Sequence, residues 1–229
     1  HRSSGAPWLA RGCGHFRCLQ WMGQIREHGA MTILQDLAAN GALPGAELRY
    51  APDWLPAPIA DELFFTVRQS VPWETHRIRL FGRWVDSPRL SCWMGDAEAA
   101  YTYSGARFEP HPWPATLREL RRRLADELGC EFNSVLANRY RDGRDCMGWH
   151  SDNEASLGPE PVIASVSLGA SRRFVLKHRQ AAPKLELSLS HGSLLLMGGE
   201  TQANYRHALP RTAKPVGERI NLTFRRIQA

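Results

Sequence analysis

The stretch from residue 133 to residue 227 alternates short runs of β-branched, aromatic and aliphatic residues with Gly, Pro and Asn. Short runs with breaks of this kind predict β-strands. The expected strands cover residues 133–140, 162–168, 173–178, 185–189, 193–197, 204–207 and 219–227. Many short strands in succession favour a sandwich or barrel. A double-stranded β-helix, which is a variant of the jelly roll, satisfies this pattern and brings residues that are distant in sequence to one open end.

Two segments that precede these strands have helical character. Residues 58–67 form the first, and residues 115–128 form the clearer second, in which four leucines recur at intervals of three and four: Leu117, Leu120, Leu124 and Leu128. Gly129 follows as a C-cap. A solvated face is expected for Arg118, Arg121, Arg122 and Arg123. The predicted class is therefore α+β and mainly β, a jelly-roll core with N-terminal packing helices.

Length and composition indicate a single globular domain. The chain has 229 residues, of which 43% are hydrophobic and 23% charged, values that suit one large core. It contains no apolar stretch of about 18 residues, so a membrane span is not expected. Residues 1–30 are rich in Gly, Arg, Ser and Cys and show no sustained period. We interpret them as a disordered or non-native extension, and residues 31–229 as the domain.

Charge and cysteine usage narrow the class of partner and the compartment. A net charge of +6 and a sequence pI near 9.4 favour an acidic partner, most commonly nucleic acid. The alternative is that the positive charge only aids solubility. The five cysteines are odd in number and include no C-x2-C pair. This pattern does not suggest a disulfide framework, and it predicts a reducing, cytoplasmic environment.

A metal centre is indicated by His150-Ser151-Asp152 and by His207. Residues i and i+2 of a strand point to the same side, so His150 and Asp152 can reach one ion, with His207 arriving from a distant strand. Two imidazoles and one carboxylate occupy one face of an octahedral ion and leave three positions open, as in non-haem Fe(II) oxygenases. Considered by itself, His207 would be interpreted more simply as a hydrogen-bonded histidine of the core.

The strand predicted at 219–227 carries a second functional pattern. Arg219, Asn221 and Arg225 are separated by even numbers, so they share one face of a regular strand. Guanidinium groups bind carboxylates with two hydrogen bonds, which suits the anionic co-substrate of such an enzyme. Arg226 falls on the other face as a solvated charge. Leu222 and Phe224 are expected in the core.

From about Phe81 to Ile227 the chain resembles the AlkB family of Fe(II)- and 2-oxoglutarate-dependent dioxygenases. Among the subgroups, it is most similar to the nucleic-acid demethylases that include the second and third human homologues. The landmarks are Phe81-Gly82, Pro88-Arg89, Trp93-Met94-Gly95-Asp96, Tyr101-Thr102-Tyr103-Ser104-Gly105, Asn138-Arg139-Tyr140, Trp149-His150-Ser151-Asp152-Asn153-Glu154, His207 and Arg219-Ile220-Asn221-Leu222-Thr223-Phe224-Arg225.

The resemblance implies a reaction and a set of site residues. It implies oxidative removal of alkyl groups from bases such as N1-methyladenine and N3-methylcytosine in DNA or RNA, with formaldehyde release and conversion of 2-oxoglutarate to succinate. Fe(II) and O2 take part, and the catalytic metal ligands would be His150, Asp152 and His207. Arg219, with Tyr140 and Asn221, would hold the C5 carboxylate of 2-oxoglutarate. The C1 carboxylate would contact Arg225 and Asn138.

Substrate contacts are also implied. A base that leaves its stack needs a ring on each face, and the resemblance assigns these faces to Tyr103 and His150. The resemblance places four further residues near the base edge or the sugar-phosphate: Tyr101, Ser104, Asn153 and Glu154. Arg89 would be an additional contact. The subgroup usually has two acids after the metal aspartate, whereas this chain has Asn153 and then Glu154. A carboxylate there would favour a cationic base.

Two further regions are predicted to meet nucleic acid. A recognition lid is expected at about 76–110, ahead of a β-helix core at about 130–229. In the lid, Phe81 is either a wedge that unstacks DNA or a hairpin aromatic packed on Trp84. The cations Arg173, Lys177 and Arg179 would share one strand face. That face is either a phosphate track or an ordinary half-exposed strand.

Alternative functions remain open at this point. The same barrel could hydroxylate a protein or a small molecule, which peptide-dependent succinate production would reveal. It could also be a non-catalytic nucleic-acid-binding protein, which would retain iron without turnover. In each case we expect a monomer that has no membrane association.

Overall fold

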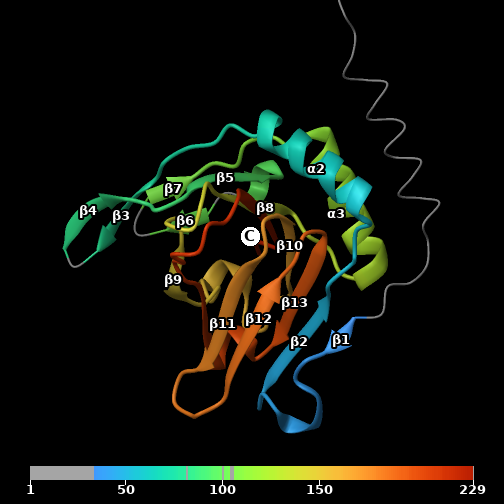
Figure 1. The fold of residues 1–229 in the computed structure, drawn as a ribbon, viewed down its shortest axis with the longest axis vertical. Coiled ribbons are helices and arrows are strands. Elements are labelled where there is room, and N and C mark those ends of the chain that lie inside the picture. The colour runs from blue at the N-terminus through green and yellow to red at the C-terminus, as the bar shows by residue number, and fades with distance from the viewer. Residues whose placement is uncertain (1–33, 81, 100, 104–105, 229) are drawn as a thin grey trace, which may run out of the picture. The chain divides into compact units, whose positions relative to one another are not determined.

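Two antiparallel sheets form the core of the computed structural model, which describes residues 34–80, 82–99, 101–103 and 106–228 (Figure 1). Side chains at 78–80, 101–103 and 106–108 are outside this description. In spatial order, the seven-stranded sheet contains β1 (Gln35–Asp36), β2 (Ala46–Ala51), β13 (Ser193–Gly199), β10 (Ile163–Gly169), β15 (Arg219–Arg225), β8 (Ser134–Tyr140) and β5 (Leu90–Gly95). The four-stranded sheet contains β12 (Lys184–Leu189), β11 (Arg172–His178), β14 (Tyr205–Leu209) and β9 (Met147–His150).

Short elements connect these sheets. Two hairpins are formed by β3 (Arg77–Leu80) with β4 (Arg83–Asp86) and by β6 (Tyr101–Tyr103) with β7 (Ala106–Phe108). The helices are α2 (Ala57–Ser70), α3 (Ala115–Leu128) and α4 (Thr201–Asn204). Single 3-10 turns occur at η1 (Ala39–Gly41), η2 (Ala97–Ala99) and η3 (Ala155–Leu157).

Each strand that the alternating pattern predicts after residue 130 is present, and each lies within two residues of its expected bounds. The mainly β jelly-roll class is therefore confirmed. The seven-stranded sheet extends beyond the range 130–229 expected for the core, because β1, β2 and β5 also belong to it. In consequence the range 76–110 expected for the lid is interrupted by β5, whose residues pair with β8.

The two sheets enclose an apolar cluster at one end. It unites residues of β2, β10 and β13 with residues of β11, β12 and β14, among them Tyr50, Ile163, Phe174, Leu189 and Met197. Strand β10 is buried along almost its whole length, because sheet neighbours flank it and layers cover both of its faces. This central position explains why most of its residues are small or apolar, with Ser165 and Ser167 as the polar exceptions.

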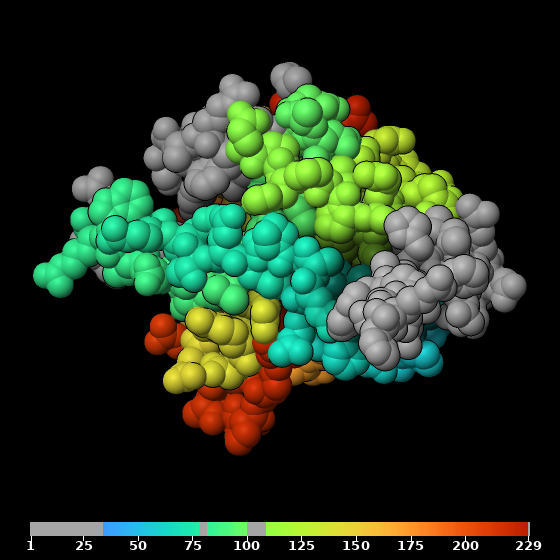
Figure 2. Space-filling model, turned by 90° about the horizontal axis from the view of Figure 1, so that it is seen from above, coloured from blue at the N-terminus to red at the C-terminus, as the bar shows by residue number. Residues whose placement is uncertain are grey.

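Helices α2 and α3 cover the other face of the seven-stranded sheet (Figures 1 and 2). The leucines of α3 face inward, and Leu117, Leu120 and Leu124 are fully buried. Each such side chain contributes about 2 kcal/mol of hydrophobic stabilisation. Phe224 on β15 stacks on Trp113, at a centroid distance of 6.2 Å, just before α3 begins. Gly129 ends α3 with a φ of +64°, as predicted for its C-cap.

The prediction that the arginines of α3 form a solvated face is wrong for Arg123. This side chain is only 8% exposed, and its Nε donates to Glu127 Oε1 at 2.6 Å. Its guanidinium lies 4.6 Å from the ring centroid of Trp54, whose Nε1 donates to Glu127 Oε2. Position 123 follows Leu120 by three residues, so it falls at the edge of the buried stripe. Arg122 is exposed and pairs with Glu119 and Asp126, as a surface arginine does.

The β3–β4 hairpin projects beyond the sheets (Figure 1). Gly82 lies in the turn of this hairpin with a φ of +79°, whereas Phe81 lies outside the described residues. Every residue of β4 is exposed, and Trp84 is 57% exposed. Such a hairpin leaves its side chains available for contact with a partner.

Residues 31–229 form one unit. Residues 1–30 lie outside the described part of the chain, so the extension expected there stays a prediction. Among the described residues, no helix is long and apolar enough to cross a membrane.

Candidate metal centre and its two cavities

Strands β9 and β14 bring the three predicted metal ligands together. His150 and His207 are directly opposite each other in the ladder between these strands, and their ring centroids lie 4.2 Å apart. Asp152 follows two residues after His150. One ligand atom from each of the three residues lies within 4.8 Å of the others. The spacing in the sequence thus correctly predicted a compact group of two imidazoles and one carboxylate.

Both imidazoles have a nitrogen available for a metal. The Nδ1 of His150 is 2.8 Å from the carbonyl oxygen of Gly148. A carbonyl only accepts, so Nδ1 donates this hydrogen bond and Nε2 is the nitrogen left to bind a metal ion. Burial lowers the pKa of His207 to about 3, and repulsion from His150 acts in the same direction. His207 is therefore neutral near pH 7, and neutral imidazole is the form that binds metal ions.

Asp152 is held as a carboxylate. Burial alone would raise its pKa, but attraction to its charged neighbours, of which Arg225 is the strongest, lowers the pKa to about 2. Its Oδ1 accepts a hydrogen bond from Arg225 at 2.7 Å. The backbone N–H of Asp152 donates to Gln202 Oε1, and Gln202 is 1% exposed. Gln202 is a positioning residue that the sequence gave no reason to select, because it comes from α4, 50 residues away.

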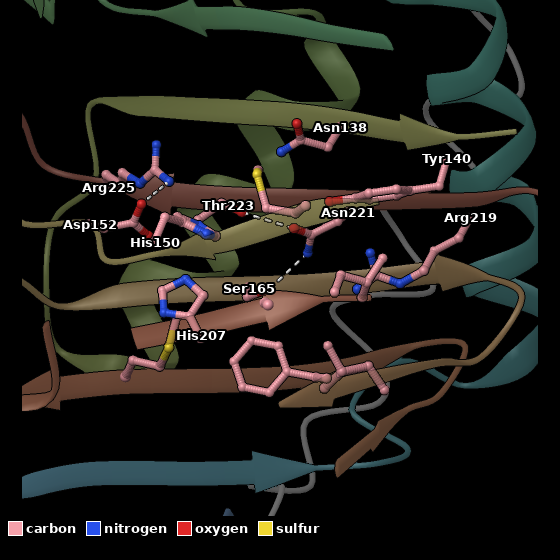
Figure 3. A pocket seen from close by; sticks show the side chains of 16 residues that line it. Asn138, Tyr140, His150, Asp152, Ser165, His207, Arg219, Asn221, Thr223 and Arg225 are labelled. Carbon is pink, nitrogen blue, oxygen red and sulfur yellow. Dashed lines mark hydrogen bonds and ion pairs between the residues drawn. The ribbon is translucent and has the colours of Figure 1, made fainter. Parts of the chain in front are cut away.

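An inner cavity extends from the metal group between the two sheets (Figure 3). In Figure 3 the group formed by His150, Asp152 and His207 lies at one end, and Arg219 and Tyr140 lie at the other. The polar lining residues are Asn138, Tyr140, His150, Asp152, Ser165, His207, Arg219, Asn221, Thr223 and Arg225. Every co-substrate residue predicted from the sequence is therefore on this wall. The shared strand face predicted for β15 is confirmed, since Leu222 and Phe224 are buried in the core and Arg226 is exposed.

Arg219 is a buried cation without a carboxylate partner among the described residues. It is 1% exposed, donates to Ser167 Oγ at 2.9 Å and lies 5.3 Å from the ring centroid of Tyr140. Its Nε has no hydrogen-bond partner. Burial lowers the pKa of Arg219 to about 10, so its neighbours do not replace the lost hydration. Burying an unpaired charge is costly, and a bound carboxylate would remove that cost.

The middle of the wall is held by hydrogen bonds within the protein. Asn221 donates to Ser165 Oγ at 2.7 Å and to the carbonyl of Val166, and its Oδ1 accepts from Thr223. Ser165 and Ser167 were missed by the sequence analysis. Their alternation within the apolar strand β10, beside β15, was the available signal, because both point to the same face as Arg219 and Asn221.

A second, outer cavity also reaches the metal group. Both cavities are lined by Met147, His150, Asp152 and Arg225, so the metal group stands at their junction. The apolar side of the outer cavity contains Trp93, Leu136, Leu157 and Ile227. Its polar side contains His76, Arg77, Ser87, Arg89, Ser91, Ser151, Glu154 and Ser156. Two buried oxygen atoms in this cavity, Ser87 Oγ and Glu154 Oε2, have no hydrogen-bond partner.

The predicted substrate residues are distributed unevenly around this cavity. Glu154 lines it, whereas Asn153 is exposed. Arg89 also lines it, and its Nε donates to Asn138 Oδ1 of the inner cavity at 2.8 Å, which links the two sites. Tyr101 and Tyr103 belong to β6, but their side chains lie outside the description, as do Phe81 and Ser104.

The predicted cation face is on the outer surface of the four-stranded sheet. Arg173, Lys177 and Arg179 are all exposed. Arg173 forms an ion pair with Glu186 at 3.3 Å, Lys177 lies over the ring of Trp149, and Arg179 donates to Ser151 Oγ. Because Ser151 lines the outer cavity, this surface reaches the mouth of that cavity.

The donor set fits a divalent iron with a dicarboxylate beside it. Two imidazoles and an ionised carboxylate are suitable ligands that leave positions open toward both cavities. The unpaired Arg219 at the far end of the inner cavity suits the second carboxylate of such a ligand. Dioxygenase chemistry is therefore compatible with every group on the inner wall.

Comparisons with known proteins agree with this geometry. The sequence pattern of the 2OG-Fe(II) oxygenase superfamily matches residues 47–225. The chain is 40% identical over 179 residues to the mouse protein named DNA oxidative demethylase ALKBH2, with 73% of this chain and 75% of that one covered. Identity to its human counterpart is 41%, covering 73% and 69% of the two chains. The human alpha-ketoglutarate-dependent dioxygenase alkB homolog 3 is 38% identical, and 73% and 62% of the chains are covered.

Solved structures with a similar fold have low sequence identity. The structure of OsALKBH1 superposes with a TM-score of 0.55 at 16% identity, covering 85% of this chain and all of that one. A 2OG-Fe(II) oxygenase family oxidoreductase from Burkholderia pseudomallei gives a TM-score of 0.53 at 17% identity, with 97% and 95% covered. Fold, metal group and sequence similarity lead to one conclusion. The chain is a dioxygenase of the 2OG-Fe(II) oxygenase superfamily that depends on Fe(II), 2-oxoglutarate and O2, and it belongs to the AlkB family.

Proposed function

We propose that the protein removes N-linked alkyl groups from nucleobases, and in particular methyl groups from N1-methyladenine and N3-methylcytosine in DNA. The observation that carries this proposal is the metal group at the junction of two unlike cavities. One cavity holds an unpaired buried cation, and the other holds an unpaired buried carboxylate oxygen beside apolar side chains. The names of the mouse and human relatives, DNA oxidative demethylases, support the same reaction.

The inner cavity binds and orients the co-substrate. Arg219, supported by Tyr140, takes the C5 carboxylate, because it is the buried cation that lacks an anion. We assign the C1 end to Arg225 and Asn138, nearer the metal group, with Arg225 also holding Asp152 in place. When bound there, Fe(II) with 2-oxoglutarate and O2 supplies hydroxylation of the N-methyl group, which is then lost as formaldehyde.

The outer cavity selects a cationic base. Methylation at N1 of adenine or N3 of cytosine gives the ring a positive charge, and the buried Oε2 of Glu154 offers a hydrogen-bond acceptor with negative charge. Trp93 and Leu157 exclude water from the base. The base must leave its stack to reach this depth, and we assign its two faces to His150 and Tyr103.

The phosphates follow the outer surface of the four-stranded sheet. Lys177 and Arg179 are exposed and have no carboxylate partner among the described ion pairs, whereas Arg173 is held by Glu186. The net charge of +6 supports an acidic polymer as the substrate. A neutral small molecule or an ordinary peptide would make no use of these cations, which is the argument against hydroxylation of either.

A turnover assay tests the proposed function. Purified protein with Fe(II) and 2-oxoglutarate should release formaldehyde from an N1-methyladenine oligonucleotide and none from its unmethylated twin. Succinate production that does not depend on the methyl group would identify a dioxygenase with another substrate. Tight DNA binding without any succinate would favour the non-catalytic alternative.

We also propose that the protein acts as a monomer in a reducing compartment. Cys92, Cys130 and Cys146 are unpaired, and Cys92 is buried with its pKa raised to about 12 by burial. Size-exclusion chromatography with light scattering should give the mass of one chain, 25.8 kDa. A stable dimer mass would contradict the monomer.

A further inference from the structure

We propose that Trp149, together with Lys177, is a stacking platform for the base next to the flipped base on a single strand. This inference rests on the proposed function and adds the form of nucleic acid to it. The platform is formed by β9 and β11 on the outer surface of the four-stranded sheet.

Trp149 is a large aromatic residue whose side chain the fold leaves partly exposed to water. Its side chain is 44% exposed, and it directly precedes the metal ligand His150. His150 faces both cavities, whereas Trp149 lines neither, which places the indole on the outer surface of β9. A large apolar ring left in water loses the hydrophobic stabilisation that burial would provide. An exposed tryptophan beside an active site is therefore well suited to bind a partner.

The cation beside the ring points to a nucleotide as that partner. The Nζ of Lys177 lies 4.3 Å from the centroid of the Trp149 ring. The strand neighbours of Lys177 in register are Arg206, which is also a cation, and Lys184, which pairs with Glu186. An aromatic ring that offers a face for stacking, next to cations that bind the adjacent phosphates, is the arrangement by which proteins hold single strands. An acidic peptide would use only the cations of this arrangement, and an apolar peptide would use only the aromatic ring.

The platform is continuous with the mouth of the outer cavity. Arg179 follows Lys177 by two residues and donates to Ser151 Oγ at 2.8 Å. Ser151 lines the outer cavity and lies two residues after Trp149. A nucleotide strand with one base inserted in the cavity would therefore place an adjacent phosphate near Arg179 and Lys177, and the adjacent base near Trp149.

The use of a stacking platform favours a single strand. In a duplex, each base already stacks on its neighbours and pairs with its partner, so leaving the stack costs a few kcal/mol. A single strand lacks the pairing, so its flanking base transfers to the indole at lower cost. Stacking on an aromatic ring is also tolerant of sequence, because every base has a π-face. Trp149 is therefore expected to add affinity for single strands irrespective of the flanking base.

Length dependence of turnover provides the test. For each protein, kcat/KM is measured with an N1-methyladenine mononucleotide and with a short single-stranded oligonucleotide that carries the same lesion centrally. The ratio of the two values reports the contribution of flanking nucleotides. Trp149→Ala should lower this ratio about tenfold, toward the lower end of what one stacked base contributes. Trp149→Phe, which keeps an aromatic face, should preserve most of the ratio.

Phe65→Ala is the matched control. Phe65 is an aromatic residue on α2, 55% exposed and outside both cavities, and its removal should leave the ratio unchanged. An unchanged ratio in Trp149→Ala would overturn the proposal. So would an equal loss with mononucleotide and oligonucleotide, because Trp149 would then act only by supporting His150. A loss of the same size with a duplex substrate would overturn the preference for a single strand.

A binding measurement separates this proposal from the demethylase function. Fluorescence anisotropy with an unmethylated, labelled single strand needs no turnover. Trp149→Ala should weaken this binding about tenfold relative to both the unmodified protein and Phe65→Ala. Weakened binding combined with no demethylation in any protein would overturn the proposed function and keep the platform. Normal demethylation with unweakened binding would overturn the platform alone.

Discussion

The two cavities that meet at the metal group are built in different ways. Apart from Asp152, the inner cavity is lined by residues of regular strands, and Asp152, Asn221 and Thr223 are fixed there by hydrogen bonds within the protein, whereas the Nε of Arg219 has no partner. The outer cavity is lined partly by β5, β8, β9 and β15, but also by the η3 turn and by the segments that connect β4 with β5 and β9 with η3. It retains two buried oxygen atoms without partners, on Ser87 and Glu154.

This difference suggests a division of labour. A rigid, hydrogen-bonded wall suits a ligand that is the same in every turnover, such as the co-substrate. Groups on loops and turns suit the ligand that has to be distinguished from others. Substitutions on the inner wall should therefore impair consumption of 2-oxoglutarate with every substrate. Substitutions in the outer cavity should change substrate choice and leave the slow consumption that occurs without substrate intact.

The largest effect is expected for Asp152→Asn. The amide has nearly the size of the carboxylate but lacks the charge that binds a metal ion and pairs with Arg225 at 2.7 Å. Succinate production should fall to background both with and without methylated DNA, and iron binding measured by calorimetry should weaken strongly. Circular dichroism should still show the folded spectrum. Near-normal turnover in this variant would contradict the assignment of Asp152 as a metal ligand.

Arg219→Ala should produce the next largest effect. Removing one partner of a buried charge pair costs about 2–5 kcal/mol, which corresponds to an increase of about 100-fold in the 2-oxoglutarate concentration needed for half-maximal rate. The increase should be equal with and without a methylated substrate, because Arg219 lines only the inner cavity. Arg226→Ala, an exposed arginine on the opposite face of the same chain segment, should change nothing. An unchanged requirement in Arg219→Ala would refute the anion role.

Glu154→Gln should distinguish the function of the outer cavity from that of the inner cavity. The amide keeps the shape of the side chain but loses the negative charge of the buried Oε2. We expect kcat/KM to fall about tenfold for a cationic N1-methyladenine, in line with the strength of hydrogen bonds to charged groups. The loss should be smaller for a neutral N3-methylthymine, and consumption of 2-oxoglutarate without substrate should be retained. An equal loss of kcat/KM for both lesions would mean that Glu154 does not discriminate between a cationic and a neutral base.

The same difference between the cavities explains what the sequence could predict. On β15 and β8 the side chains alternate with a period of two, so the shared face of Arg219, Asn221 and Arg225, and the buried Leu222 and Phe224, follow from spacing alone. The pairing of His150 with His207 needed only two strands that meet. Periodicity therefore predicted the β15 part of the inner wall, whereas Asn138 and Tyr140 followed from the family resemblance and Ser165 was missed.

The outer cavity does not follow from a period. Ser87 of the outer cavity comes from a connecting segment, and Gln202, which holds the backbone of Asp152, comes from a one-turn helix. No regular pattern relates them to His150 or Asp152. The prediction that Arg123 is solvated was wrong for a related reason. Arg123 lies at the edge of the apolar stripe, and its contact with Trp54 depends on tertiary packing. Strand β2 was also missed, since its sequence lies among turns far from the other strands and is fixed by pairing with β13.

The smallest effects are expected on the cation surface, where Arg173 and Arg179 can be compared directly. Both are exposed, but Arg173 is already paired with Glu186, whereas Arg179 contacts the neutral Ser151. An exposed contact to phosphate contributes little to affinity at physiological salt, so its salt dependence is the sharper measure. Arg179→Ala should reduce the slope of log affinity against log salt for a single strand by about 0.7, which is the value for one phosphate contact. Arg173→Ala should reduce it less, because Glu186 already neutralises that charge. Equal slopes for the two variants would show that the surface acts as a diffuse positive field and not through individual phosphate contacts near the cavity mouth.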